Sequence, residues 1–178
     1  HLSLAFIIFA VLLRYVLQLK HPAAKIFSSK AYYFSNLLIA AIFLQIIYGA
    51  YVAGLNAGLI YNEFPKMGKG IVPSEFWAFS PFWLNFFENH AAIQFIHRLL
   101  AFVILFLVVG FFAYSKKAHM SHIVKSMSGL LLLIVFLQII VGVLTLLYHV
   151  PIWLASLHQM VALALFSVAI ILNFYVRR

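Results

Sequence analysis

Two histidines lie inside apolar stretches of the chain, where polar side chains are rare. His97 lies roughly 10 Å along a helix from the polar edge at Asn89. His158 follows six residues after the start of another apolar stretch, at about Ile152. Two imidazoles at matched depth in neighbouring helices are the axial ligands that a haem iron binds. The pair therefore predicts a bis-histidine haem, with His97 and His158 as the ligands of its iron.

Arg98 follows His97 directly and places a guanidinium in the same apolar stretch. A buried guanidinium needs an anionic partner. The haem propionates and Glu88 of the preceding loop are equal candidates for that partner. Gln94 and Gln159 lie close to the histidines in sequence and are candidates for orienting the ligands or, in preference, for bridging helices.

The composition is that of a membrane protein. Of the 178 residues 66% are hydrophobic and 8% charged, with a mean hydropathy of +1.10, whereas soluble domains carry about 25% charged residues. The net charge of +9 comes from Lys and Arg at the ends of apolar stretches, so it indicates membrane topology and not nucleic-acid binding. The chain has no cysteine, which excludes disulfides, thiolate ligands and iron–sulfur clusters within it.

The carboxylates are confined to one loop. The chain has no aspartate, and its three glutamates are Glu63, Glu75 and Glu88. Pumps and many ion-coupled transporters use acidic groups within the membrane, so this distribution disfavours a permease. Zinc or copper would need a third protein ligand beside His97 and His158, and the sequence offers none at that depth.

Five apolar stretches are each long enough to cross a bilayer. We therefore predict an all-α polytopic membrane protein. A four-helix transmembrane bundle over 32–178 would be joined by a basic cytoplasmic link over 21–31 to one additional transmembrane helix over 1–20. The expected helices cover about 2–19, 32–53, 91–114, 126–147 and 152–176.

The outer loop over 54–89 is expected to contain short interfacial helices. Its segment PSEFWAFSPFWLNFFEN (Pro73–Asn89) has aromatic residues at helical spacing. Pro81 should divide this segment into two short helices. An aromatic amphipathic segment of this kind favours a position on the membrane surface, as an anchor rather than as a ligand contact.

The distribution of Lys and Arg predicts the orientation in the membrane. Nine lie on one side, while Lys66 and Lys69 lie on the other. The C-terminus is then cytoplasmic, the loop is outside, and both histidines lie in the outer half of a bacterial inner membrane, with the mitochondrial inner membrane as the alternative. The nine are Arg14, Lys20, Lys25, Lys30, Lys116, Lys117, Lys125, Arg177 and Arg178.

An internal repeat relates the two halves of the predicted bundle. FLQIIYG at Phe43–Gly49 returns as FLQIIVG at Phe136–Gly142, and each copy precedes a helix with one of the two histidines. Related hairpins can pack about a pseudo-twofold axis, which would point His97 and His158 toward each other. The glycine that ends each copy is expected to allow close helix contact.

Three motifs in order resemble the haem A synthase family (COX15/CtaA), which oxidises a methyl group of haem O to a formyl group and so supplies haem A to terminal oxidases. The resemblance covers nearly the whole chain. It implies eight transmembrane helices in two homologous halves, of which this chain would be the last helix of the first half and the complete second half. The motifs are GAYVAGLNAGLIYNEFPKMG (Gly49–Gly68), NFFENHAAIQFIHR (Asn85–Arg98) and TLLYHVPIWLASLHQ (Thr145–Gln159).

The resemblance also implies roles for single residues. The second-half histidines of the family fall on His97 and His158 and are taken to ligate a haem b cofactor. A first-half histidine falls on His1, which becomes a candidate catalytic residue. The family's other first-half histidine and its glutamate have no counterpart here, and Glu63 stands where the family more often has a small hydroxyl residue. The chain by itself is therefore expected to bind haem b and not to turn over.

The resemblance implies a haem A synthase with haem b as cofactor, haem O as substrate and haem A as product. The expected partners are membrane lipid, a haem O synthase, a ferredoxin-type electron donor and a second copy of the chain, and no nucleic acid. The main alternative is an electron-transfer cytochrome b that has no substrate. A permease, which would bind no haem, is the third candidate.

Overall fold

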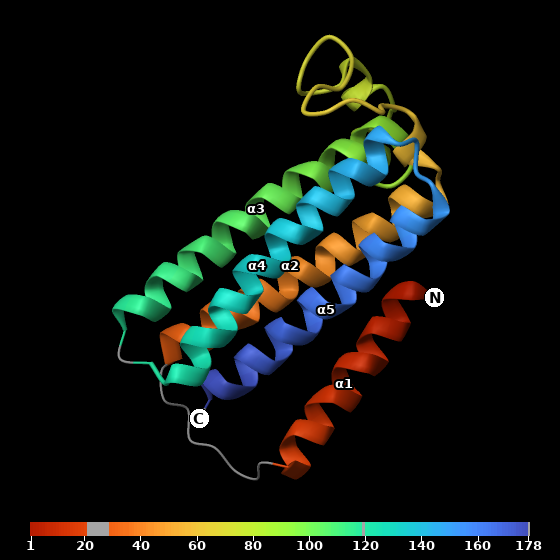
Figure 1. Cartoon of the computed structure of the whole chain (residues 1–178). Coiled ribbons are helices and arrows are strands. Elements are labelled where there is room, and N and C mark those ends of the chain that lie inside the picture. The colour runs from red at the N-terminus through yellow and green to blue at the C-terminus, as the bar shows by residue number, and fades with distance from the viewer. Residues whose placement is uncertain (21–28, 119, 178) are drawn as a thin grey trace.

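The computed structural model describes residues 1–20, 29–118 and 120–177, and the regular secondary structure in these ranges consists of helices joined by turns and loops (Figure 1). Five long helices are each long and apolar enough to cross a membrane, which confirms the predicted fold class. They are α1 (Leu2–Lys20), α2 (Ser29–Gly54), α3 (His90–Lys117), α4 (His122–Leu147) and α5 (Ile152–Val176). Most of the basic link expected over 21–31 lies outside the described residues, and the predicted division into domains stays a prediction.

Helices α2, α3, α4 and α5 form the bundle. Each packs against the next in chain order, and α5 closes the ring by packing against α2. Helices α3 and α5 therefore lie diagonally opposite each other, as do α2 and α4. Helix α1 lies outside the ring against α5 and α2 (Figure 1). A side chain on α3 can meet one on α5 only across the centre of the bundle.

The hydrophobic core fills the half of the bundle that lies toward the C-terminus of α5. Phe111, Leu131 and Leu172 are fully buried there. Hydroxyl and amide groups link the helices within this half, because a buried polar group without a partner is costly. One link joins the hydroxyls of Ser115 and Ser128 over 2.8 Å. The core and this hydrogen bond hold α3 against α4 in this half of the bundle.

Asn173 connects α1 to the bundle. Its side chain is completely buried on α5. It accepts a hydrogen bond of 3.0 Å from Arg14 on α1 and donates to Ser35 and Asn36 on α2 over 2.8 and 2.9 Å. Three helices thus meet at one amide.

Local sequence signals determine where the helices begin. The side chain of Asn89 accepts hydrogen bonds from the backbone of Ala91 and Ala92, and so caps the start of α3. Ser121 caps α4 in the same way. Between α4 and α5 the chain reverses through His149 and Val150, both in the left-handed region with φ of 61° and 57°. That conformation strains a β-branched residue, so this turn is held by the structure around it.

The loop between α2 and α3 contains three short 3₁₀ helices, η1 (Ala57–Leu59), η2 (Ser74–Trp77) and η3 (Phe82–Phe86). It covers the end of the bundle where α3 and α5 begin (Figure 1); this end is called the loop end below. Pro81 immediately precedes η3, so the predicted division into two short helices is confirmed. Trp77, Phe82 and Trp83 are more than half exposed, and membrane anchoring by these side chains stays a prediction.

Candidate haem-binding site

His97 and His158 meet in the centre of the bundle, near the loop end. Their ring centres are 6.5 Å apart and their planes are inclined by 70°. Two imidazoles that each bind one metal ion at about 2 Å have ring centres about 6 Å apart. The diagonal helices α3 and α5 thus bring the two predicted ligands to the separation that one iron atom requires.

A glycine from the adjacent helix lies against each imidazole. A Cβ atom added at Gly49 of α2 would lie 3.2 Å from Cε1 of His97. A Cβ atom added at Gly142 of α4 would lie only 2.8 Å from Cε1 of His158. The two glycines of the repeat therefore make room for the imidazole rings of the neighbouring helices. The close helix contact predicted at these glycines thus takes the form of a ring packed against a helix.

A glutamine one turn before each glycine faces the same ring. Nε2 of Gln45 lies 3.4 Å from Nε2 of His97, and Nε2 of Gln138 lies 3.2 Å from Nε2 of His158. Gln45 also donates a hydrogen bond of 3.0 Å to the backbone carbonyl of His97. Each half of the bundle thus places a glutamine, a glycine and a histidine together, in the same order along the chain.

Several buried polar atoms at this centre have no hydrogen-bond partner among the described residues. They include Nδ1 of His97 and of His158, and Oε1 of Gln45 and of Gln138. Buried polar atoms in folded proteins normally have partners. A neutral donor set of two imidazoles, with spare acceptors behind them, is suited to the iron of a haem. The residues present therefore fit a bis-histidine haem.

Arg98 attaches the loop to α3. Its guanidinium donates to the backbone carbonyls of Tyr61, Glu63 and Lys66 over 2.9, 3.1 and 3.2 Å. The structure gives it no hydrogen bond to Glu88. Its Nε atom is buried without a partner among the described residues. Binding of Arg98 to a haem propionate stays a prediction.

The two glutamines singled out beside the histidines have different positions. Gln94 donates to the carbonyl of Tyr61 over 3.0 Å, so it joins α3 to the loop and not, as predicted, to another helix. Gln159 is exposed on α5. Gln45 and Gln138 were not predicted to contact the rings. Both lie at the same position of the FLQII repeat, and this shared position is the signal that could have identified them.

His1 lies apart from the two imidazoles. It precedes α1, is exposed, and its carbonyl accepts the first helical hydrogen bond, from Ala5. No contact between His1 and His97 or His158 is present in the described part of the chain. A catalytic role for His1 stays a prediction. Among the described residues no group of three or more His, Cys, Asp or Glu side chains could hold a metal ion by itself.

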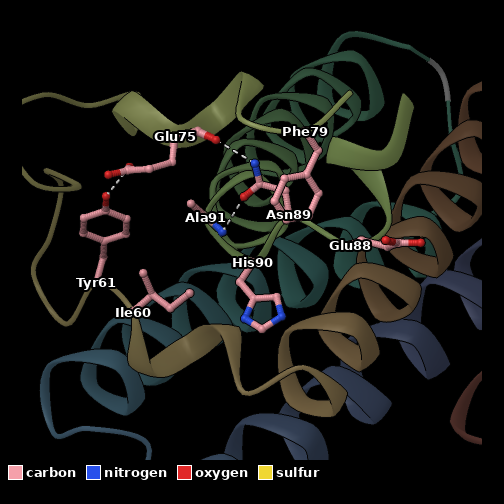
Figure 2. A pocket seen from close by; sticks show the side chains of 8 residues that line it. All are labelled: Ile60, Tyr61, Glu75, Phe79, Glu88, Asn89, His90 and Ala91. Carbon is pink, nitrogen blue, oxygen red and sulfur yellow. Dashed lines mark hydrogen bonds between the residues drawn. The ribbon is translucent and has the colours of Figure 1, made fainter. Parts of the chain in front are cut away.

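A shallow pocket at the loop end is separate from the histidine pair and is lined by Tyr61, Glu75, Asn89 and His90, among others (Figure 2). The hydroxyl of Tyr61 donates to the carboxylate of Glu75 over 2.6 Å. This hydrogen bond lowers the pKa of the Glu75 carboxyl and raises the pKa of the Tyr61 phenol. Asn89 donates to the backbone carbonyl of Glu75 over 2.6 Å, so the pocket wall is fixed to the cap of α3.

The model of the COX15-CtaA family, described as cytochrome oxidase assembly protein, matches residues 1–170. The chain belongs to this family. The family indicated by the three sequence motifs is therefore confirmed. No solved structure matches the chain.

Relatives named Heme A synthase match the entire chain. The protein of Wolbachia sp. subsp. Brugia malayi is 45% identical, with 52% of its own length covered. That of Wolbachia pipientis wMel is 44% identical, with 50% covered, and that of Nitrosospira multiformis 37%, with 51% covered. The chain spans about half the length of the curated relatives it matches. With its five spans and bacterial relatives, it is a multi-pass bacterial membrane protein.

Proposed function

We propose that this chain forms a bis-histidine haem b site of a haem A synthase, an oxidoreductase that converts a methyl group of haem O to the formyl group of haem A. The observation that carries the proposal is the meeting of His97 and His158 across the bundle with ring centres 6.5 Å apart, in a chain whose relatives are named Heme A synthase. Haem b bound here would supply one-electron transfer, because two axial imidazoles leave the iron no open position.

The residues of the chain would bind, orient and shield this group. The imidazoles of His97 and His158 would hold the iron from two helices that lie diagonally opposite each other in the bundle. Gly49 and Gly142 would allow the rings to stand between neighbouring helices. Arg98, one residue after a ligand, holds the loop over the same end of the bundle, where a covering loop limits access of water.

The haem proposal is tested by adding haem b to the purified protein in detergent and recording its absorption and electron paramagnetic resonance spectra. A low-spin ferric signal from two imidazole ligands is expected. His97→Ala and His158→Ala should each abolish that signal. His90→Ala, on the same helix as His97 but at its first position, is the matched control and should retain it. A high-spin or absent haem signal in the unaltered protein would refute the proposal.

A second test separates the synthase from an electron-transfer cytochrome b. Both readings predict the same haem spectrum, so the substrate must be examined. Membranes that contain the protein at its natural length are incubated with haem O, a reductant and oxygen, and the haems are then separated by chromatography. Appearance of haem A supports the synthase, whereas unchanged haem O beside a normal bis-histidine spectrum supports the electron carrier.

The orientation and the partners are part of the proposal. The excess of Lys and Arg on one side supports a cytoplasmic C-terminus and a loop end outside. A haem O synthase would deliver the substrate, a ferredoxin-type protein would donate electrons, and a second copy of the chain is a further candidate partner. Reporter fusions at the C-terminus test the orientation, since a fluorescent protein folds on the cytoplasmic side and a periplasmic phosphatase does not become active there.

A further inference from the structure

We propose that Gln45 and Gln138 are positioning residues for the two axial histidines and set the reduction potential of the iron that they bind. This inference rests on the proposed function, because it concerns the same pair of imidazoles. Neither glutamine was expected from the sequence to touch the site. They are the only side chains that the described structure places at hydrogen-bond distance from the two rings.

The two halves of the bundle place their glutamines in the same way. Gln45 and Gln138 each lie on the helix before a histidine helix and one turn before the glycine that packs against the ring. Their amide nitrogens lie 3.4 and 3.2 Å from the facing imidazole nitrogen. Because the arrangement occurs in both halves of the chain, it indicates that each glutamine serves the imidazole beside it and does not only fill space between two particular helices.

The two nitrogens of each imidazole have different surroundings. Gln45 and Gln138 face Nε2 of the two rings, and Nδ1 of each ring has no partner among the described residues. An imidazole that binds iron through Nδ1 carries its proton on Nε2, and that N–H needs an acceptor. Oε1 of Gln45 and of Gln138 is a buried acceptor without a partner among the described residues. A half-turn of the Gln138 amide about its last bond exchanges its nitrogen and oxygen, so Oε1 takes the place beside the ring and accepts that proton. The same half-turn of Gln45 exchanges its hydrogen bond to the backbone carbonyl of His97 for the bond to the ring.

The physical consequence is a change in the electron density of the ligand. An acceptor on the N–H makes an imidazole a stronger donor to the metal, which stabilises ferric more than ferrous iron. Removing the acceptor should therefore raise the reduction potential, and replacing it with a carboxylate should lower it. A tenfold change in the ratio of ferric to ferrous affinity corresponds to about 59 mV for a one-electron couple.

The experiment compares variants of the haem b-loaded protein by redox titration and by haem retention. Gln45→Met and Gln138→Met keep the length of the side chain and remove the acceptor, whereas Gln45→Glu and Gln138→Glu strengthen it. Gln159→Met is the matched control, because Gln159 adjoins His158 in sequence but is exposed. Each Met variant should shift the ferric-to-ferrous affinity ratio about tenfold toward ferrous and weaken haem retention about 10- to 100-fold.

The sign of the shift separates positioning from mere packing. The Glu variants should shift the ratio in the opposite direction, toward ferric, and should retain haem. Equal potentials in the unaltered protein and the Met variants would overturn the inference, as would shifts of the same sign, or loss of haem, in the Met and Glu variants alike. If the unaltered protein has no bis-histidine spectrum, the proposed function itself fails, which is a different result.

Discussion

Replacing Gly142 with alanine should displace His158, a proposed axial ligand, and weaken the proposed haem binding without unfolding the bundle. The new Cβ atom would lie 2.8 Å from Cε1 of His158. Non-bonded carbon atoms are comfortable at about 3.5–4.0 Å, so the ring or α4 must move by about 0.7–1.2 Å. Iron ligands must keep their positions to within about 0.5 Å. Excess volume in a packed site costs about 1–3 kcal/mol, which corresponds to about 5- to 150-fold in haem affinity.

The corresponding glycine of the other half provides an internal comparison. A Cβ atom at Gly49 would lie 3.2 Å from His97, so a movement of about 0.3–0.8 Å is enough. Gly49→Ala should therefore weaken haem binding less than Gly142→Ala. Alanine is the better helix former by about 1 kcal/mol, and both variants should keep the helical content of the unaltered protein.

The assay is a haem titration followed by absorbance, with circular dichroism as the check on folding. Gly129→Ala on α4 and Gly110→Ala on α3 are the controls, because a Cβ atom at those positions meets a phenylalanine ring at an ordinary 3.6 or 3.5 Å. Both controls should bind haem like the unaltered protein. The reasoning would be refuted if Gly142→Ala kept full affinity, or if the controls lost as much affinity as the two site variants.

Three further outcomes are expected. Arg98→Lys should lose most of the hydrogen bonds to the loop carbonyls, because an ammonium lacks the planar fork of a guanidinium, and limited proteolysis should cut the loop between α2 and α3 about tenfold faster. The hydrogen bond between Tyr61 and Glu75 should persist over the pH range from the lowered pKa of the Glu75 carboxyl to the raised pKa of the Tyr61 phenol. In the variant Tyr61→Phe, an NMR titration should show that the pKa of the Glu75 carboxyl returns toward its ordinary value. Asn173→Leu should leave Arg14 without its acceptor and destabilise the protein by about 1–3 kcal/mol, measured as an earlier thermal transition in detergent.

Sequence pattern was sufficient for the helices because each apolar stretch ends at a recognisable signal. The predicted second and fourth helices were short by several residues at their N-terminal ends, where α2 begins at Ser29 and α4 at His122. Each missing turn contains a lysine, Lys30 in α2 and Lys125 in α4, and this charge separates the turn from the apolar stretch that hydropathy detects. In α4 the Ser121 cap supports the additional turn, and such a cap is detectable in the sequence once it is sought.

The histidine pair was predictable because its depth and its repeat position can both be counted along the chain. Its surroundings were not predictable in the same way. A glutamine in an apolar helix can face lipid, a neighbouring helix or a ligand, and only the packing of α2 on α3 and of α4 on α5 decides this for Gln45 and Gln138. Arg98 presents the same difficulty, since its acceptors are main-chain oxygens and no residue type in the sequence reports where those oxygens point.

The use of main-chain oxygens by Arg98 makes the attachment of the loop indifferent to the identity of the side chains it passes. Every amino acid brings the same carbonyl, so a substitution at Lys66 leaves its hydrogen bond to Arg98 available. The side chains of Tyr61, Asn62 and Glu63, in contrast, form hydrogen bonds of their own within or below the loop. The side chain at position 66 can then change on the exposed surface of the loop without altering how Arg98 holds the loop. The anchoring arginine is the residue on which such freedom depends.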